Sequence, residues 1–226
     1  MNIILNINTA ESAAELSIAR DGKILESVIN LQQKDHASFI QPAISELLQK
    51  CGLNIKELKA VAVSNGPGSY TGLRVGLATA KGLCYALNIP LITLNTLSVM
   101  AHTSIMIDQP ETNDTLYCPM IDARRNEVFT AVYDRFLNIQ LAPTPLILSE
   151  NCLEKFDQTH RMVFSGSGSA KWKPLSTRKT SVFVNPEDHL ESMASMSFNS
   201  FTINNFTDLA YSEPFYFKEF FYPQKT

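Results

Sequence analysis

Short segments rich in β-branched and other apolar residues occupy the start of the chain and predict strands. These segments are 2–8, 14–20 and 23–31. Asp21-Gly22 between the second and the third is a two-residue turn signal, so the pair predicts a β-hairpin. The next segment, 35–52, repeats its apolar residues every three to four positions, which predicts a helix that ends at Gly52.

The pattern then alternates between strand and helix. It predicts, in order, a strand at 58–65, a helix up to Leu87, a strand at 90–95 and a helix through Thr103. Three antiparallel strands followed by strand–helix–strand crossovers indicate a mixed sheet with helices on its faces, which is an α/β architecture.

A polar segment with a proline, 107–114, predicts a boundary between an N-terminal lobe at 1–106 and a C-terminal lobe at 115–226. The second lobe has the weaker pattern. Its expected elements are strands at 115–122, 127–134, 137–147 and 162–164, a short helix near 149–156 and a helix within 187–201. The expected class is therefore α/β with two lobes, of which the second is smaller and mixed.

The charge and the cysteines narrow the classes of protein that fit. The formal net charge of −3 and the pI of about 5.8 predict no broad basic face, which argues against a protein that holds nucleic acid unaided. The four cysteines are widely spaced, which fits a reducing compartment better than a disulfide framework. We find neither a secretory leader nor an apolar run of about 18 residues, so we expect a cytoplasmic protein.

The densest turn chemistry lies between a predicted strand and a predicted helix, in the sequence VSNGPGSYTGLRVG at 63–76. Its Gly-x-Gly start has the context of a dinucleotide-binding turn, but the third glycine comes one residue late and the lysine of a P-loop is missing. The residues that could still form a vestigial phosphate or anion site are Gly66, Gly68, Ser69 and Thr71.

The helix after this loop favours another interpretation, in which glycine allows two backbones to approach closely. Gly72, Gly76 and Ala80 are four residues apart and share one nearly bare face. That face could pack on the protein's own sheet or receive a helix of a partner, and the sequence alone leaves both open.

A second unusual sequence, MIDARRNEVFTAVYD at 120–134, places Asp122, Arg124 and Arg125 at an expected strand-to-strand turn. The arginine pair could hold a phosphate or a carboxylate; alternatively, an Asp–Arg ion pair could fix the hairpin. Catalytic and metal-binding motifs are missing, because the sequence has no His-x3-His, His-Glu-x2-His or Gly-x-Ser-x-Gly. We therefore expect no catalytic residue, no metal and no cofactor.

These segments closely resemble the bacterial TsaB (formerly YeaZ) family of threonylcarbamoyladenosine biosynthesis proteins. The resemblance rests on SNGPGSYTGLRVGLATAKGLCYAL, DHASFIQPAISELL and PMIDARRNEVFTAVYD, with the early INTA and the late EPFYF in comparable places. It covers the first half throughout, but only the start and the end of the second half.

The resemblance implies two lobes of the actin-like, sugar-kinase-like fold and a non-catalytic scaffold in tRNA modification. In that family, a TsaB protein pairs through its N-terminal lobe with TsaD, which transfers threonylcarbamoyl to an adenosine beside the anticodon. The ATPase TsaE joins the complex. The resemblance therefore implies a TsaD-like and a TsaE-like partner, with tRNA bound only through the complex and no membrane contact.

Two departures from catalytic relatives support the scaffold interpretation. TsaD-type proteins carry a helical His-x3-His metal pair, whereas this chain has Gln32 and His36. The first strand of the family usually ends in Ile-Asp-Thr-Ser, and an Asp at that place in the wider superfamily helps to position the magnesium of ATP; here Asn8 stands in its place. The competing hypotheses are a stand-alone ATPase or kinase of the same fold and a metal-dependent peptidase.

For the partner interface we expect the bare strip together with the helix at 36–51. The candidate residues are Phe39, Ala43, Leu47, Gly72, Leu73, Gly76 and Ala80. The same surface could pair two copies of the chain when the partner is absent, because an exposed apolar patch can be self-complementary.

Overall fold

The computed structural model describes residues 1–32, 36–110, 113–157, 160–176 and 180–217. The first half contains β1 (Ile3–Asn8), β2 (Ala14–Arg20), β3 (Lys23–Asn30), α1 (His36–Lys50), the 3-10 helix η2 (Ile55–Glu57), β4 (Leu58–Ser64), α2 (Tyr70–Leu87), β5 (Leu91–Leu94) and α3 (Thr96–Asp108). The second half contains β6 (Thr115–Asp122), β7 (Glu127–Tyr133), β8 (Ile139–Ile147), α4 (Glu154–Asp157), β9 (Arg161–Ser165), α5 (Ser169–Trp172), β10 (Ser181–Phe183) and α6 (Leu190–Thr202).

The two halves build sheets of the same topology. The first sheet has the order β3-β2-β1-β4-β5, with antiparallel β1–β2 and β2–β3 pairs and parallel β1–β4 and β4–β5 pairs. The second sheet has the order β10-β9-β6-β7-β8 and repeats this arrangement, with β6 in the place of β1. The fold is therefore a structural duplication, and the predicted α/β class with two mixed sheets is confirmed.

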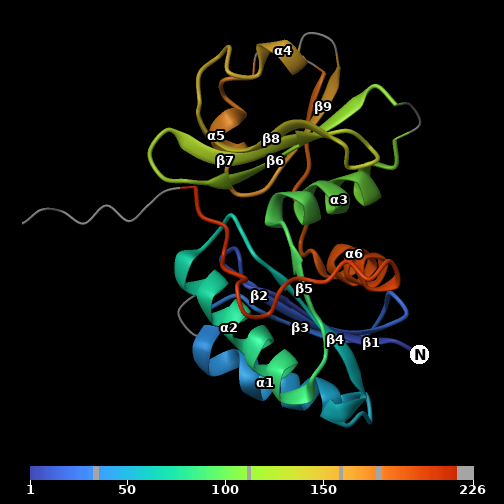
Figure 1. The fold of residues 1–226 in the computed structure, drawn as a ribbon. Coiled ribbons are helices and arrows are strands. Elements are labelled where there is room, and N and C mark those ends of the chain that lie inside the picture. The colour runs from blue at the N-terminus through green and yellow to red at the C-terminus, as the bar shows by residue number, and fades with distance from the viewer. Residues whose placement is uncertain (33–35, 111–112, 158–159, 177–179, 218–226) are drawn as a thin grey trace, which may run out of the picture.

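The last helix of each half packs on the sheet of the other half. α3 buries Leu97 and Met100 against Tyr117 of the second sheet, and α6 buries Met193 against Ile4 of the first. Figure 1 shows α3 beneath the second sheet and α6 above the first, so that the two helices lie between the sheets. The predicted division at 1–106 and 115–226 did not anticipate this exchange of helices, because an apolar stripe does not reveal which sheet it covers.

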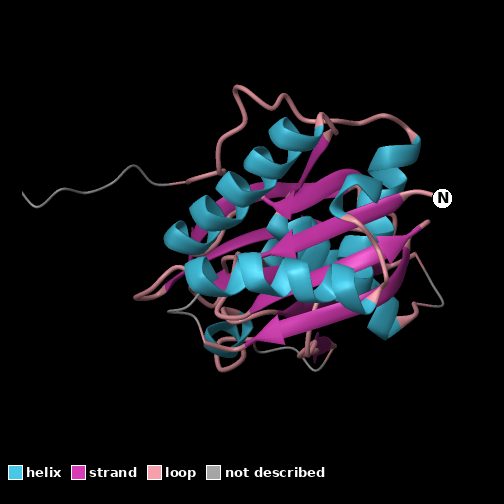
Figure 2. Cartoon of the chain, turned by 90° about the horizontal axis from the view of Figure 1, so that it is seen from below, coloured by secondary structure: helices cyan, strands magenta, loops and turns pink. Residues whose placement is uncertain are grey.

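On its opposite face, the first sheet is covered by α1 and α2, which lie across it side by side (Figure 2). α2 approaches β1 through its glycine strip. The Thr9 hydroxyl donates to the carbonyl oxygen of Gly72 at 2.8 Å, and a Cβ atom at Gly72 or Gly76 would collide with Thr9. A Cβ atom at Gly82, in contrast, would meet nothing within 4 Å.

The prediction that the strip receives a partner is therefore wrong. All candidate residues of that interface except Phe39 are buried within the monomer, and Phe39 is half-buried against the same core. The buried ones are Ala43, Leu47, Gly72, Leu73, Gly76 and Ala80. Residue spacing identified a shared helix face correctly, but it could not tell whether that face points inward.

Across the residues that the structure describes, no helix combines the length and the apolar character needed to cross a bilayer.

Gly72→Ala should lower the free energy of unfolding by about 1–3 kcal/mol, the usual cost of overpacking, because the new methyl group would meet the Thr9 carbonyl oxygen. Gly82→Ala is the matched control on the same helix. It should raise that free energy by up to about 1 kcal/mol, because alanine has the higher helix propensity and finds open space. Urea unfolding followed by circular dichroism measures both, and equal effects would contradict the packing described here.

Candidate functional site

A cleft of about 760 Å³ opens where the loop before α2 meets the turn between β6 and β7. Its walls come from β6, β7 and the turn between them on one side, and from the loop after β1 and the start of α2 on the other. The lining residues are Ala10, Glu11, Ser12, Gly68, Ser69, Tyr70, Thr71, Ile121, Asp122, Ala123, Arg124, Phe129 and Ser167. The structure thus brings Gly68, Ser69, Thr71 and Arg124 of the candidate anion site to one place.

The glycine loop uses its polar groups for packing within the lobe. The backbone N–H of Ser69 donates to the carbonyl oxygen of Ala10 at 2.6 Å, and the α-carbon of Gly68 packs against that carbonyl. The Ser69 hydroxyl caps α2 by accepting the N–H of Gly72 at 3.3 Å. Gly66 is buried, and a Cβ atom there would lie 2.6 Å from the carbonyl oxygen of Phe215.

Gly66 lies outside the residues that line the cleft, whereas Gly68 and Ser69 line it, so an anion site at these residues stays a prediction that the following contacts make less favourable. A phosphate cradle presents several free N–H groups to the anion. Here the Ser69 N–H is already bonded, and carbonyl oxygens, which repel anions, face the glycine α-carbons.

The second half repeats this packing in the loop before α5. The N–H of Gly168 donates to the carbonyl oxygen of Met120 at 2.8 Å, which is the counterpart of the bond from Ser69 to Ala10. Gly166 has a left-handed φ of +85° beside the same carbonyl oxygen. The recurrence in both halves indicates that the glycine loops serve close backbone contact in the fold.

The turn between β6 and β7 holds its two arginines in the left-handed region, with φ of +68° for Arg124 and +50° for Arg125. Lys171 fixes this turn by donating to the Asp122 carboxylate and, at 2.7 Å, to the carbonyl oxygen of Arg125. Asp122 also accepts the N–H of Arg124 at 2.6 Å. The hydrogen bond from Lys171 lowers the pKa of Asp122. Of the two alternatives that the sequence left open, the Asp–Arg ion pair is replaced here by Lys171, although the charge of Arg124 acts on the Asp122 carboxylate in the same direction.

This arrangement leaves the side chains of Arg124 and Arg125 exposed to solvent. Arg124 is exposed and lines the cleft, whereas Arg125 is exposed outside the lining residues. The ion pair of Asp122 within the described residues is made by Lys171, and the Arg124 charge acts on the same carboxylate from a greater distance. A left-handed φ is costly for a residue with a Cβ atom, so the turn holds two exposed arginines in a strained conformation at the rim of the cleft.

A buried polar network below the cleft was not found from the sequence, because its members are far apart in the chain. The Glu15 carboxylate accepts the Asn8 side-chain amide at 3.0 Å and the backbone N–H of His189 at 3.2 Å. The His189 ring lies between Glu11, with Nε2 to Oε2 at 3.6 Å, and the hydroxyl of Thr103, with Nδ1 to Oγ1 at 2.9 Å. This network joins the loop after β1 to α3 and α6.

Burial and charge shift two pKa values in this network. Burial raises the pKa of Glu15 above 4.5, although the charge of His189 and the hydrogen bond from Asn8 act in the opposite direction. For His189, burial alone would lower the pKa. The hydrogen bond to Glu11 and the charges of Glu15, Glu11 and Asp188 outweigh it, so the pKa of His189 rises above 6.5.

The position expected for a magnesium-binding carboxylate does not fit that role. Asn8 is buried, and its amide group is bonded to Glu15 instead of facing the cleft. Within the described part of the chain, no group of three His, Cys, Asp or Glu side chains is arranged to hold a metal ion.

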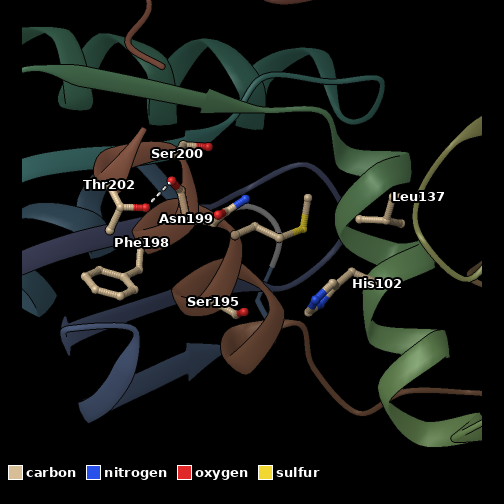
Figure 3. A pocket seen from close by; sticks show the side chains of 8 residues that line it. His102, Leu137, Ser195, Phe198, Asn199, Ser200 and Thr202 are labelled. Atoms are coloured by element: carbon tan, nitrogen blue, oxygen red, sulfur yellow. Dashed lines mark hydrogen bonds between the residues drawn. The ribbon is translucent and has the colours of Figure 1, made fainter. Parts of the chain in front are cut away.

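A second cavity of about 460 Å³ lies between α3, α6 and the turn before β8. Figure 3 shows His102 of α3 on one side and Ser195 and Asn199 of α6 on the other. The His102 Nδ1 atom is within 3.0 Å of the Ser192 hydroxyl, and burial lowers the pKa of His102. The lining residues include no carboxylate, lysine or arginine, so this cavity offers no charged group to a ligand.

Comparison with known proteins identifies the family. A model of the family described as TsaD, tRNA N6-adenosine threonylcarbamoyltransferase, matches residues 23–218. A Bacillus subtilis protein named tRNA threonylcarbamoyladenosine biosynthesis protein TsaB is 30% identical over 175 residues, which are 76% of this chain and 74% of that protein. The chain belongs to the TsaB group of the TsaD family.

Further relatives of the TsaB group agree with this assignment. The Escherichia coli protein of the same name is 33% identical over 132 residues, which are 58% of this chain and 55%, about half, of the relative. The solved structure of YeaZ from Pseudomonas aeruginosa superposes with a TM-score of 0.80 at 22% identity, over 96% of this chain and 100% of that one. The resemblance read from the sequence is confirmed, and the chain has the fold of YeaZ.

Glu11→Gln should lower the pKa of His189, because the variant removes a carboxylate charge and weakens the hydrogen bond that raise it. Titration of the His189 ring by NMR measures this. Glu191→Gln, an exposed change on α6, is the control and should leave the value unchanged.

The raised pKa of His189 makes the stability of the chain depend on pH. Because the folded-state pKa is raised, the contribution of charged His189 is complete below pH 6.5 and is lost as the pH rises through the folded value. As the pH rises from 6.5 through the folded-state pKa of His189, the Glu11→Gln variant should therefore lose less stability than the unmodified chain. A His189 that titrates at or below 6.5 in the unmodified chain would contradict this account.

Proposed function

We propose that this chain is a non-catalytic subunit of the machinery that makes threonylcarbamoyladenosine in tRNA, and that it acts by docking a TsaD-like catalytic subunit. Membership of the TsaB group and the pathway named for its relatives support the process. The internal use of the glycine loop and of Asn8 supports a role other than nucleotide chemistry.

The docking proposal rests on Gly82, which lies in the interior of α2 although no contact within the described part of the monomer requires a glycine there. Glycine costs about 1 kcal/mol relative to alanine in a helix interior. At Gly72 and Gly76 the close contact with the end of β1 offsets this cost, but a side chain at Gly82 would meet only open space. A glycine on an exposed helix face favours the close approach of another backbone from outside.

The surface around Gly82 is suited to a helix of the partner. A stripe of Ala78, Gly82 and Tyr85 runs along the later turns of α2 and carries small uncharged side chains up to Tyr85, which is 83% exposed. The neighbouring helix α1 adds Pro42 and Ser45 to this outward face. Figure 2 shows both helices on the near side of the sheet with no other element across them. An exposed tyrosine beside small residues is a common anchor in protein interfaces.

The same outward face also supports the remaining partner proposals. Without the TsaD-like subunit it would pair two copies of this chain isologously. A TsaE-like ATPase and tRNA would then contact the assembled pair, since the net charge of −3 gives the chain alone little attraction for nucleic acid.

For the anion site we propose a smaller set than the sequence suggested. Arg124 and Thr71 face one cleft, and Arg125 stands beside them on the same strained turn. The exposed guanidinium groups of Arg124 and Arg125 would bind a phosphate or a carboxylate of a partner bidentately.

Gly82→Arg should abolish co-purification of the chain with a TsaD-like subunit, because the long charged side chain would separate the two helix faces. Ser195→Arg is the matched control, an exposed small-to-arginine change on α6 across the sheet, and should co-purify normally. Circular dichroism should show both variants folded.

Retention of the complex by a folded Gly82→Arg chain would place the docking surface elsewhere. ATP or peptide hydrolysis by the purified chain alone would instead favour the competing enzyme hypotheses.

A further inference from the structure

The last described segment of the chain runs from the first sheet to the second. Thr207 joins the edge strand β5, with its N–H donating to the carbonyl oxygen of Leu91 at 2.8 Å. Lys81 of α2 then holds the segment by donating to the carbonyl oxygens of Ala210 and Ser212 at 3.2 and 3.0 Å. In Figure 1 the red end of the chain rises beside α2 toward the edge of the second sheet.

At the first turn of α2, this segment makes polar and aromatic contacts. The N–H of Phe215 donates to the carbonyl oxygen of Asn65 at 2.7 Å. The ring of Tyr216 lies 5.2 Å from that of Tyr70, and its hydroxyl accepts a hydrogen bond from Nε of Arg74 at 3.2 Å. The Arg74 guanidinium in turn covers the Tyr70 ring at 4.1 Å.

The next residue contacts the second sheet. Phe217 stacks on Phe129 of β7, with ring centroids 5.3 Å apart. It also packs edge-on against Phe215, at 4.7 Å. Phe129 lines the cleft on one side and Tyr70 lines it on the other, so neighbouring residues of one short segment touch both walls.

We propose that residues 214–217 form an interlobe latch that holds β7 near the first turn of α2 and thereby fixes the two walls of the cleft relative to each other. The segment contacts the first lobe at Asn65 and Tyr70 and stacks on Phe129 of the second lobe. Because aromatic pairs require a particular geometry, the lobes cannot move apart without breaking one of these contacts. Release of Phe217 frees the β6–β7 turn with Arg124, while the hydrogen bond of Phe215 keeps the segment on the first lobe.

The test is hydrogen exchange of the full chain, followed by mass spectrometry. Phe217→Ala should speed exchange about 2- to 10-fold at the start of β7 and in the loop and first turn at 66–73, the range expected for one lost aromatic contact. The other strands of both sheets should be unchanged. Tyr211→Ala, in the same segment but 86% exposed, is the matched control and should change nothing.

A second variant keeps the proposal testable if Phe217→Ala does not fold. Tyr216→Phe retains the ring on Tyr70 but removes the acceptor for Arg74, and should give a smaller increase at the same two places. An increase at β7 alone, an increase spread over both sheets, or no change in either variant would overturn the latch.

Discussion

The rest of the structure depends on the close contact between the end of β1 and the loop that leads into α2. Thr9 and Ala10 press their carbonyl oxygens against glycine α-carbons, and the Thr9 hydroxyl bonds to the first turn of the helix. Only glycine allows this distance, because a Cβ atom at Gly68, Gly72 or Gly76 would overlap β1 or the residues that follow it. The contact fixes α2 on the sheet and forms one wall of the cleft.

This contact also divides α2 into two faces with different roles. The inward glycine face builds the first lobe, so its residues are unavailable to any partner. The outward face retains Gly82 and Tyr85, which nothing in the monomer requires. Because the second half repeats a similar loop contact at Met120, the glycine loops belong to the duplicated architecture.

Most of the fold could be predicted from the sequence, because apolar spacing and turn residues act locally. The short elements α5 and β10 were missed, since a few residues give no period. The exchange of α3 and α6 between the sheets was also missed, because an apolar helix face does not identify the sheet that covers it. For the site, spacing grouped Gly72 with Gly76 and Ala80 correctly but left the direction of that face open. The contact of Glu11 with His189 depends on the folded chain alone.

We propose that the outward face of α1 and α2 binds another subunit while the cleft side of the chain remains free. Hydrogen exchange of the unmodified chain, measured with and without a TsaD-like protein, tests it most directly. We expect slower exchange in α1 and along α2 on addition of that protein, with β6 to β9 unchanged. Protection confined to the second sheet, or no protection in either helix, would contradict it.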